Sequence, residues 1–445
     1  MDTATAPQCL SPSSLRRCAG ALLAAWLSAA GVQAARAGNT SPYLFGDWHG
    51  ARSRLADRGV DFSFKYTSEV AHNDAGGTRP LTRYADQWEL GAAFDLDKLW
   101  GWRGARFEVT MNDRNGRDLD ADAQLGTYQQ VQEVYGRGQT WHLALFALTW
   151  RSAGGRFTWR VGRLPADADF DVFPCDFQNL SFCDSPPGRI VGDYWMDSPV
   201  STWAAVLDWR SGAHSHLKLG AYQVNPHYTD DHWARANGWK PAFPGGTTGA
   251  LVPLEYDWSP RLRGLPGSYR IGAWYNTAGG ADLYYDADRE PIALTGGPAL
   301  RRSARSGGYL TIQQQVSGEP GERGTTLFLN LTLADADTSA TDGQYALGVE
   351  YKGAFGRPRD AIGAAIGATH GSHRLAARQR LYDRLHPAAA MPVQDGSEYV
   401  AELFYGWSPL AALTLRPNLQ YVLHPGGTAR HGHALVLGLK TLIAF

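Results

Sequence analysis

The sequence lacks long hydrophobic runs and lacks an excess of charge of either sign. Beyond its N-terminal segment the chain has no run of about eighteen apolar residues, which excludes membrane-spanning helices. The 445 residues include 42 basic and 43 acidic ones, for a formal net charge of −1. This balance indicates neither a nucleic-acid-binding surface nor an overall field that attracts anions, so it favours a small neutral partner and no nucleic acid.

The motifs of common enzyme classes are also missing. The chain has no G-x-S-x-G turn, no H-E-x-x-H helix and no phosphate-binding glycine loop that ends in lysine. Two histidine pairs, His370 with His373 and His431 with His433, have no obvious third ligand nearby. We therefore expect no catalytic residues, no cofactor and no metal site.

Cysteine is scarce, with four residues in the chain, and two of them lie in a segment that we expect to be removed. In residues 1–37, Arg16 and Arg17 precede a short apolar stretch and small-residue cleavage sites, which is the pattern of a secretory signal peptide. The apolar stretch is too short for a membrane anchor. Export to an oxidising compartment leaves Cys175 and Cys183, which we expect to form a disulfide.

The chain does contain a regular pattern with a period of two residues. From residue 60 onward, short stretches alternate between apolar and polar residues, and clusters of Gly, Asp, Asn and Pro separate them. In the first stretch Phe62 lies on the apolar face and Lys65 on the polar face. About sixteen such stretches can be counted, an even number as in bacterial membrane barrels, and the least clear lie over 128–150 and 361–371.

Alternation alone does not distinguish a membrane barrel from a soluble β-sandwich, because both have one apolar face per strand. Two features favour the barrel. Aromatic residues such as Trp100 and Trp102 gather at the ends of the stretches, where the interfaces of a bilayer would lie. The last stretch stays apolar to Phe445, which would be an unprotected edge in a soluble protein. The sequence therefore predicts an all-β fold, a transmembrane antiparallel β-barrel of about sixteen strands over residues 60–445.

A leader precedes the predicted barrel, and long loops interrupt it. In the leader, residues 38–59, Asp47 can cap a short helix that ends at Gly59. Bacterial barrels have short turns at one end and longer loops at the other. We expect the long loops over residues 166–200, 225–247 and 372–396.

Three segments are distinctive beyond their periodicity. The first runs from Ser41 to Glu69 and contains Gly-Asp-Trp, the second runs from Gly162 to Trp203 and contains the cysteine pair, and the third runs from Tyr399 to Phe445 and contains LQYVLHPGG. Together they resemble the carbohydrate-selective porin family OprB over almost all of the mature chain. One departure is His49 after Trp48, where the family usually has glycine.

The resemblance implies an outer-membrane barrel that lets monosaccharides such as glucose diffuse into the periplasm. It also implies that the terminal aromatic residue, Phe445, is read by the barrel-assembly machinery. Outer-membrane lipid and lipopolysaccharide would surround such a barrel. The sequence leaves open whether three barrels associate into a homotrimer.

A sugar pore needs directional partners for hydroxyl groups and a flat apolar surface for the C–H face of the ring. By strand parity, side chains of opposite charge interleave on the inward face of the early strands. We predict that the narrowest part of the pore is lined by Arg106, Glu108, Asn112, Arg114 and Arg160, with Trp274 as a stacking surface. The simpler alternative is that these residues pair with one another and touch no solute.

Other polar residues are expected to face the same lumen. The late strands direct to the opposite wall Glu398, Glu402, Arg416, Asn418, Gln420 and Lys440. The loop acids Asp167, Asp169 and Asp171 either fold inward and narrow the pore or remain solvated at the surface. The predicted disulfide would stiffen that loop.

Two other functions remain as alternatives. A general or anion-preferring porin of the same fold would show an inward ladder of lysine and arginine without acids, whereas glutamates are interleaved here. A secreted β-rich carbohydrate-binding protein would bury its apolar faces in a protein core and would stay soluble without detergent.

Overall fold

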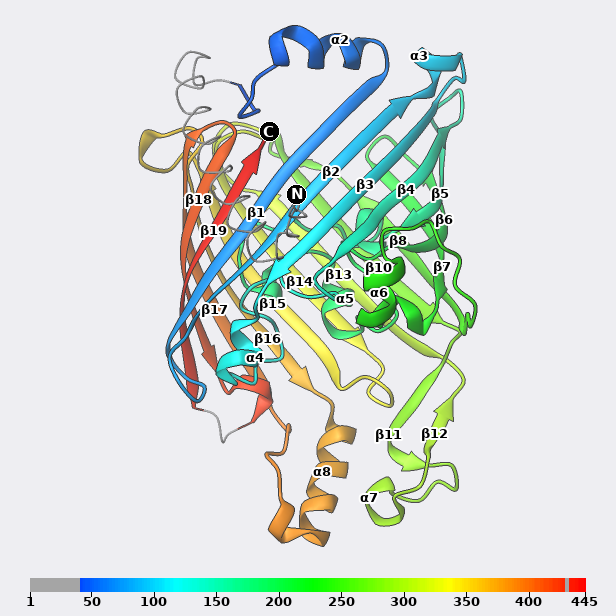
Figure 1. The fold of residues 1–445 in the computed structure, drawn as a ribbon, viewed down its shortest axis with the longest axis vertical. Coiled ribbons are helices and arrows are strands. Elements are labelled where there is room, and N and C mark those ends of the chain that lie inside the picture. Colours follow the sequence, from blue (N-terminus) through cyan, green and yellow to red (C-terminus); the bar gives the residue numbers. More distant parts are fainter. Residues whose placement is uncertain (1–40, 429–431) are drawn as a thin grey trace, which may run out of the picture.

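The alternating stretches form one closed antiparallel sheet in the computed structural model, which describes residues 41–428 and 432–445 (Figure 1). The sheet has 17 strands, of which β9 (Arg261–Leu262) has only two residues, so sixteen long strands form the barrel wall. The long strands are β1 (Val60–Ala75), β2 (Thr82–Asp95), β3 (Ala105–Gly116), β4 (Trp141–Arg151), β5 (Phe157–Leu164), β6 (Thr202–Arg210), β7 (Ser215–Val224), β8 (Gly249–Trp258), β10 (Leu265–Asn276), β13 (Arg305–Gln315), β14 (Gly324–Ala334), β15 (Thr341–Lys352), β16 (Ala361–Gly371), β17 (Ser397–Leu410), β18 (Leu413–Leu423) and β19 (His433–Ala444). β1 pairs with both β2 and β19, which closes the barrel as the sequence predicted.

The helical segments are short. They are η1 (Trp48–Gly50), α2 (Ala51–Asp57), α3 (Leu96–Trp100), α4 (Leu119–Ala123), η2 (Ala166–Ala168), η3 (Leu180–Phe182), α5 (Pro186–Ile190), η4 (Pro226–Thr229), α6 (Asp231–Asn237), α7 (Ile292–Thr295), η5 (Ala354–Gly356), α8 (His373–Leu385), η6 (Pro387–Ala389) and η7 (Pro425–Gly427). Within residues 41–428 and 432–445, no helix has the length and apolar character needed to cross a membrane.

The two ends of the barrel carry connections of different length. Short turns such as 152–156 and 411–412 join the strands at one end, where α2 and the C-terminus also lie (Figure 1). The opposite end carries the predicted long loops, now bounded as 165–201, 225–248 and 372–396. Two more long loops were not predicted, 117–140 and 277–304. The latter contains a hairpin of β11 (Gly280–Asp286) and β12 (Ala299–Arg302), which projects beyond the barrel beside α8 (Figure 1).

Two of the long loops fold into the barrel and form a core inside it. Val131 of the β3–β4 loop (117–140) packs in one cluster with Phe177 of the β5–β6 loop (165–201) and with Phe404 of the wall. Trp195 of the β5–β6 loop packs in a second cluster with Tyr309 of the wall. Burial of these apolar side chains holds both loops inward. The loops therefore narrow the lumen at its middle.

Large aromatic side chains are exposed on the outer face near both ends of the barrel. Trp150 and Trp258 lie close to the short turns, whereas Tyr345 and Tyr399 lie close to the long loops. Amphipathic rings favour the two interfaces of a bilayer. Their positions confirm the predicted aromatic belts of a membrane barrel.

The leader differs in detail from its prediction. The helix α2 begins at Ala51, later than a cap at Asp47 would place it, because the residues between form the 3-10 turn η1. Asp47 still accepts a hydrogen bond from the backbone N–H of Ser53, at 2.9 Å. His49 has a φ of 56°, a left-handed conformation that favours the glycine usual at this position.

The leader ends at Gly59 and contacts the last residue of the chain. Helix α2 ends before Gly59, as predicted, and this glycine has a φ of 93°. The predicted signal peptide, residues 1–37, lies outside the described residues. The leader contacts the end of the chain, because the Arg52 guanidinium donates a hydrogen bond to the Phe445 carbonyl at 2.7 Å.

Candidate functional site

The inward loops enclose a polar cavity of about 390 Å³. Its walls come from β3, β4, the β3–β4 loop, the β5–β6 loop and the β7–β8 loop (225–248). Residues of both charges line it: Arg114, Glu133, Arg137, Asp184, Arg189, Asp197, Asp230 and Asp231. The lining also includes neutral side chains that can donate and accept hydrogen bonds: Tyr128, Gln129, Gln130, Tyr135, Ser198, Tyr228 and Thr229.

Arg114 lies where β3 reaches the cavity, and its side chain connects the wall to both inward loops, with Nη2 3.5 Å from the carbonyl oxygen of Ser198 in the β5–β6 loop. Its Nε donates to Gln87 Oε1 at 2.7 Å. Its Nη1 lies 3.3 Å from the carbonyl oxygen of Glu133 and 3.4 Å from that of Tyr135. The guanidinium has five N–H donors, and these last contacts are long. Arg114 therefore keeps donor capacity for a solute.

Arg137 and Arg189 differ in how fully their donors are used. Among the residues that the structure describes, the side chain of Arg137 makes only long hydrogen bonds, at 3.4 and 3.5 Å, with the carbonyl oxygen of Gly192. Arg189 donates to the carbonyl oxygens of Cys183 at 2.6 Å and Asp184 at 2.7 Å, so it stabilises the loop around the cysteine pair. Arg137 is thus the more available cation for a solute.

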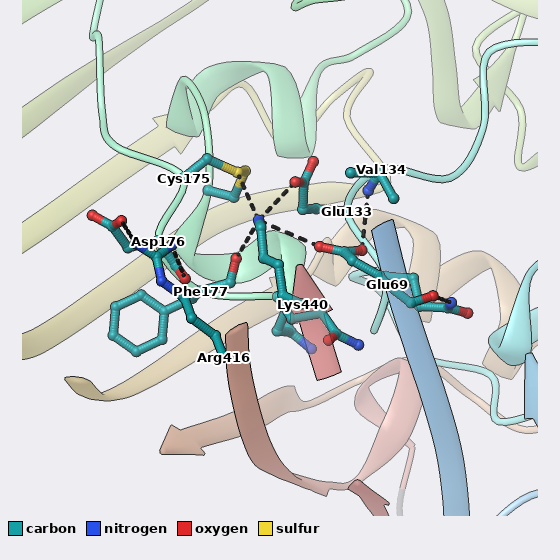
Figure 2. Close-up of polar contacts among 12 residues, drawn as sticks. Glu69, Glu133, Val134, Cys175, Asp176, Phe177, Arg416 and Lys440 are labelled. Atoms are coloured by element: carbon teal, nitrogen blue, oxygen red, sulfur yellow. Dashed lines mark hydrogen bonds and ion pairs between the residues drawn. A yellow bond between two sulfur atoms is a disulfide. The ribbon is translucent and has the colours of Figure 1, made fainter. Parts of the chain in front are cut away.

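Two acids of the cavity, Glu133 and Asp184, lie close to the disulfide. Glu133 Oε1 accepts a hydrogen bond from Lys440 Nζ at 2.8 Å (Figure 2). Burial, together with the neighbouring charge of Glu133, raises the pKa of Asp184 to about 6.

Oxygens of both Glu133 and Asp184 lie within 4.8 Å of the sulfurs of Cys175 and Cys183, a grouping that resembles a metal site. These two cysteines form a disulfide, however, so neither sulfur is the thiolate that a metal requires.

Among the predicted pore residues, only Arg114 lines this cavity. Arg106 and Glu108 form an ion pair with an Nε–Oε1 distance of 3.1 Å near the short-turn end of β3. Eight residues separate Arg106 from Arg114, which is about 26 Å along an extended strand. The early charged residues therefore do not meet at one narrow ring.

Of the other predicted pore residues, Arg160 and Trp274 are engaged with the β5–β6 loop, and Asn112 is buried. Arg160 Nη1 lies 2.5 Å from Asp169 Oδ1, and Asn112 is 2% exposed. Trp274 donates from its indole nitrogen to the Tyr194 hydroxyl at 3.0 Å and packs edge-on against Trp195. Arg160 and Trp274 therefore support the β5–β6 loop from the barrel wall.

The loop acids fold inward, as one of the two expectations stated. Asp169 pairs with Arg160, and Asp167 accepts a hydrogen bond from the backbone N–H of Ser198 at 3.1 Å. Asp171 is fully buried, and burial raises its pKa to about 7. The disulfide between Cys175 and Cys183 closes the same loop, as predicted.

Sequence patterns missed the residues that do most to shape the cavity. Glu133 and Arg137 lie in the β3–β4 loop, within the stretch over 128–150 that showed no clear alternation. Asp184 and Arg189 lie in the β5–β6 loop. A loop has no side-chain period, so only the mixed charge of these stretches could have indicated a site.

Comparisons with known proteins agree with this architecture. The sequence profile of the family described as "Carbohydrate-selective porin, OprB family" matches residues 80–445. Porin B of Pseudomonas aeruginosa is 39% identical over 445 residues, covering 96% of this chain and 97% of that protein. A putative porin, QuiX, of Acinetobacter baylyi is 30% identical over 427 residues, covering 91% and 93%.

A solved structure extends the similarity to three dimensions. The high-pH structure of Pseudomonas putida OprB matches with a TM-score of 0.88 and 39% identity, covering 91% of this chain and 99% of that chain. Family and fold together indicate a channel of the outer membrane rather than an enzyme. The chain belongs to the OprB family of carbohydrate-selective porins.

Proposed function

We propose that the protein lets monosaccharides such as glucose diffuse passively into the periplasm, and that they pass through the cavity between the two inward loops. The observation that carries this proposal is the mixed charge of the cavity lining, in which Arg114 and Arg137 occur together with Glu133 and Asp184. Each sugar hydroxyl both donates and accepts a hydrogen bond. Guanidinium groups supply donors and carboxylates supply acceptors, so together they satisfy adjacent hydroxyls.

The cavity must bind its solute weakly, because a channel that holds its solute tightly stops conducting. A hydrogen bond to a charged group contributes roughly 1.5–3 kcal/mol, so only a few can act at once. Arg189 is already saturated by loop carbonyls, and Arg114 is partly engaged. This partial engagement keeps the number of strong contacts to a solute small.

The charge distribution favours a neutral solute over an anion. The cations of the cavity share its lining with acids: Arg114 acts on the charge of Asp184, and Arg137 is influenced by Asp197 and Asp231. A general or anion-preferring pore of the same fold would need cations without nearby acids. The ion pair of Arg106 and Glu108 likewise combines a cation with an acid. We propose that the sugar passes this pair between the cavity and the short-turn end of the barrel.

The proposal is tested with purified protein in liposomes and planar bilayers. Arg137→Gln and Glu133→Gln each remove one charged partner of the sugar, so glucose should block ion current about tenfold more weakly. Glucose should also enter liposomes faster than a disaccharide in the native protein. Arg323→Gln is the matched control, because Arg323 lies in a short turn and pairs only with Glu319 in the contacts described. Unchanged glucose block in both cavity variants would overturn the proposal.

The proposal also covers the protein's other partners, which are the barrel-assembly machinery, the lipids of the outer membrane and further copies of the chain. We infer that Phe445 is read by the barrel-assembly machinery before the barrel closes, since in the folded protein it is 5% exposed and packs on Phe64. The exposed aromatic belts would contact outer-membrane lipid and lipopolysaccharide. Association into a homotrimer stays a prediction, and the mass of the detergent-solubilised particle tests it.

A further inference from the structure

Acidic side chains of the barrel wall accept hydrogen bonds from the backbone of the inward loops. Glu402 of β17 accepts from the N–H of Gln178 at 2.9 Å and from that of Asn179 at 2.8 Å. Glu398, on the same face of β17, accepts from the N–H of Tyr128 at 2.6 Å. Backbone donors buried away from water need such partners. The wall therefore binds the β3–β4 and β5–β6 loops at defined points.

Lys440 of β19 joins these attachments at one point (Figure 2). Its Nζ lies 2.8 Å from Glu133 Oε1 of the β3–β4 loop and 3.3 Å from Glu69 Oε1 of β1. It also donates to the carbonyl oxygen of Phe177 of the β5–β6 loop at 2.9 Å, and it lies 3.6 Å from Cys175 Sγ. One ammonium group thus contacts both loops and a neighbouring strand.

The burial of Lys440 makes these contacts mutually dependent. The residue is 1% exposed, and Glu69 is fully buried. A buried charge without a partner is strongly unfavourable, so the ammonium requires the carboxylates and they require it. Glu69 also accepts a hydrogen bond from the N–H of Val134, next to Glu133, at 3.3 Å (Figure 2). The cluster therefore fixes both the side chain of Glu133 and the backbone beside it.

We propose that Lys440 is a positioning residue of the pore, which orients the Glu133 carboxylate at the cavity wall and holds both inward loops at the spacing that sets the aperture. The orientation of Glu133 matters to the solute only if sugars pass through the cavity, so that part rests on the proposed function. The spacing of the loops does not depend on which solute passes.

The test is Lys440→Met, which keeps an unbranched side chain that is one atom shorter and removes the ammonium group. Glu133 and Glu69 then face each other without a cation, and the β5–β6 loop loses its contact at Phe177. Three changes are expected in planar bilayers and liposomes. Ion selectivity shifts toward cations, glucose block weakens about tenfold, and disaccharides enter faster relative to glucose.

Three further variants separate position from charge. Lys65→Met is the matched control, because Lys65 also faces the lumen from β1 but pairs only with Glu89 in the contacts described. It should leave the preference for glucose over disaccharides unchanged. Lys440→Arg keeps the cation and should retain most of that preference. Lys440→Met combined with Glu69→Gln restores the charge balance, so ion selectivity should recover while glucose block stays weak.

The outcomes distinguish this inference from the proposed function. If the native protein prefers glucose and Lys440→Met keeps the native glucose block and disaccharide exclusion, the positioning role is wrong. If the native protein shows no preference for glucose, the proposed function fails, and the aperture is still tested by a higher single-channel conductance in Lys440→Met. Should that variant not fold, Glu69→Gln alone must weaken glucose block, and an unchanged block there also overturns the inference.

Discussion

Inward charges near the short turns and inward charges at the middle of the barrel follow the same strand parity but bind different partners. Lys65 pairs with Glu89 across β1 and β2 at 2.8 Å, and their side chains are 58% and 24% exposed. Lys440 faces the same lumen, is 1% exposed and contacts both inward loops. In the contacts described, the inward loops reach Lys440 but not Lys65. The position of a charged residue along its strand therefore determines whether its side chain is exposed to water in the lumen or contacts an inward loop.

The difference in burial leads to a difference in energy. An exposed ion pair contributes about 0.2–1 kcal/mol, because water screens it and the side chains lose rotamer freedom. Removing one partner from a buried group costs more, about 3–5 kcal/mol for a buried charge pair. The mid-barrel residues should therefore be sensitive to substitution in both stability and transport, and the residues near the short turns should tolerate it.

The largest effect is expected for Glu402→Gln. Glu402 accepts two loop N–H groups, and the glutamine side chain can accept only through its oxygen while its amide group faces the other donor. We expect a loss of about 3 kcal/mol in the free energy of unfolding, measured by urea denaturation in detergent. Single-channel conductance should rise, because the β5–β6 loop is held at fewer points.

Glu89→Gln supplies the matched comparison from the other region. It makes the same chemical change at an inward wall position, but Glu89 contacts Lys65 rather than a loop. Its free energy of unfolding should change by less than about 1 kcal/mol, and its conductance should stay close to that of the native protein. Equal losses in the two variants would contradict the distinction between the regions.

A smaller effect is expected from pH at the cavity itself. The pKa of Asp184 is raised to about 6, by burial and by the charge of Glu133. Its carboxylate is charged above that pH and becomes neutral as the pH falls through it, so the cavity then loses a negative charge. Ion selectivity, read as the reversal potential in a salt gradient, should shift toward anions on acidification.

Asp184→Asn tests the assignment of that shift. At neutral pH the ion selectivity of the variant should already be shifted toward anions relative to the native protein. Its reversal potential should not change as the pH passes the pKa of Asp184. A shift of native size in Asp184→Asn would assign the titration to another group. The pH-dependent selectivity would then come from acids that hold the loops and not from an acid that lines the cavity.

Strand parity predicted the fold and the direction of the wall residues. It placed Glu402 and Lys440 inward, because every second residue of a strand faces the same side. It did not predict their partners, since these lie in loops without a side-chain period. Arg106 and Arg114 illustrate the same point. Parity places both residues on the inward face of β3, but it does not predict at which position along the strand the lumen is narrowest.

The cavity residues were the least predictable. Glu133 and Arg137 depend on how the β3–β4 loop folds back into the barrel. That path is determined by contacts far apart in sequence, such as the hydrogen bond from Gln420 Nε2 to the carbonyl oxygen of Val131 at 3.0 Å. Asp184 depends likewise on the β5–β6 loop. For this loop the sequence predicted the approximate bounds and, through the export signal and the oxidising compartment it implies, the disulfide between Cys175 and Cys183. It left open whether the loop acids fold inward.

The smallest effect is expected for Arg106→Gln and Glu108→Gln, which remove an exposed ion pair near the short turns. Their side chains are 48% and 26% exposed, so the free energy of unfolding should change by no more than about 0.5 kcal/mol. Conductance should change modestly because the local lumen charge changes, and glucose block should fall less than in Arg137→Gln. A loss of block as large as in Arg137→Gln would locate the narrowest sugar contact at this pair, where the sequence alone had predicted it, and would reverse the assignment of roles to the two regions.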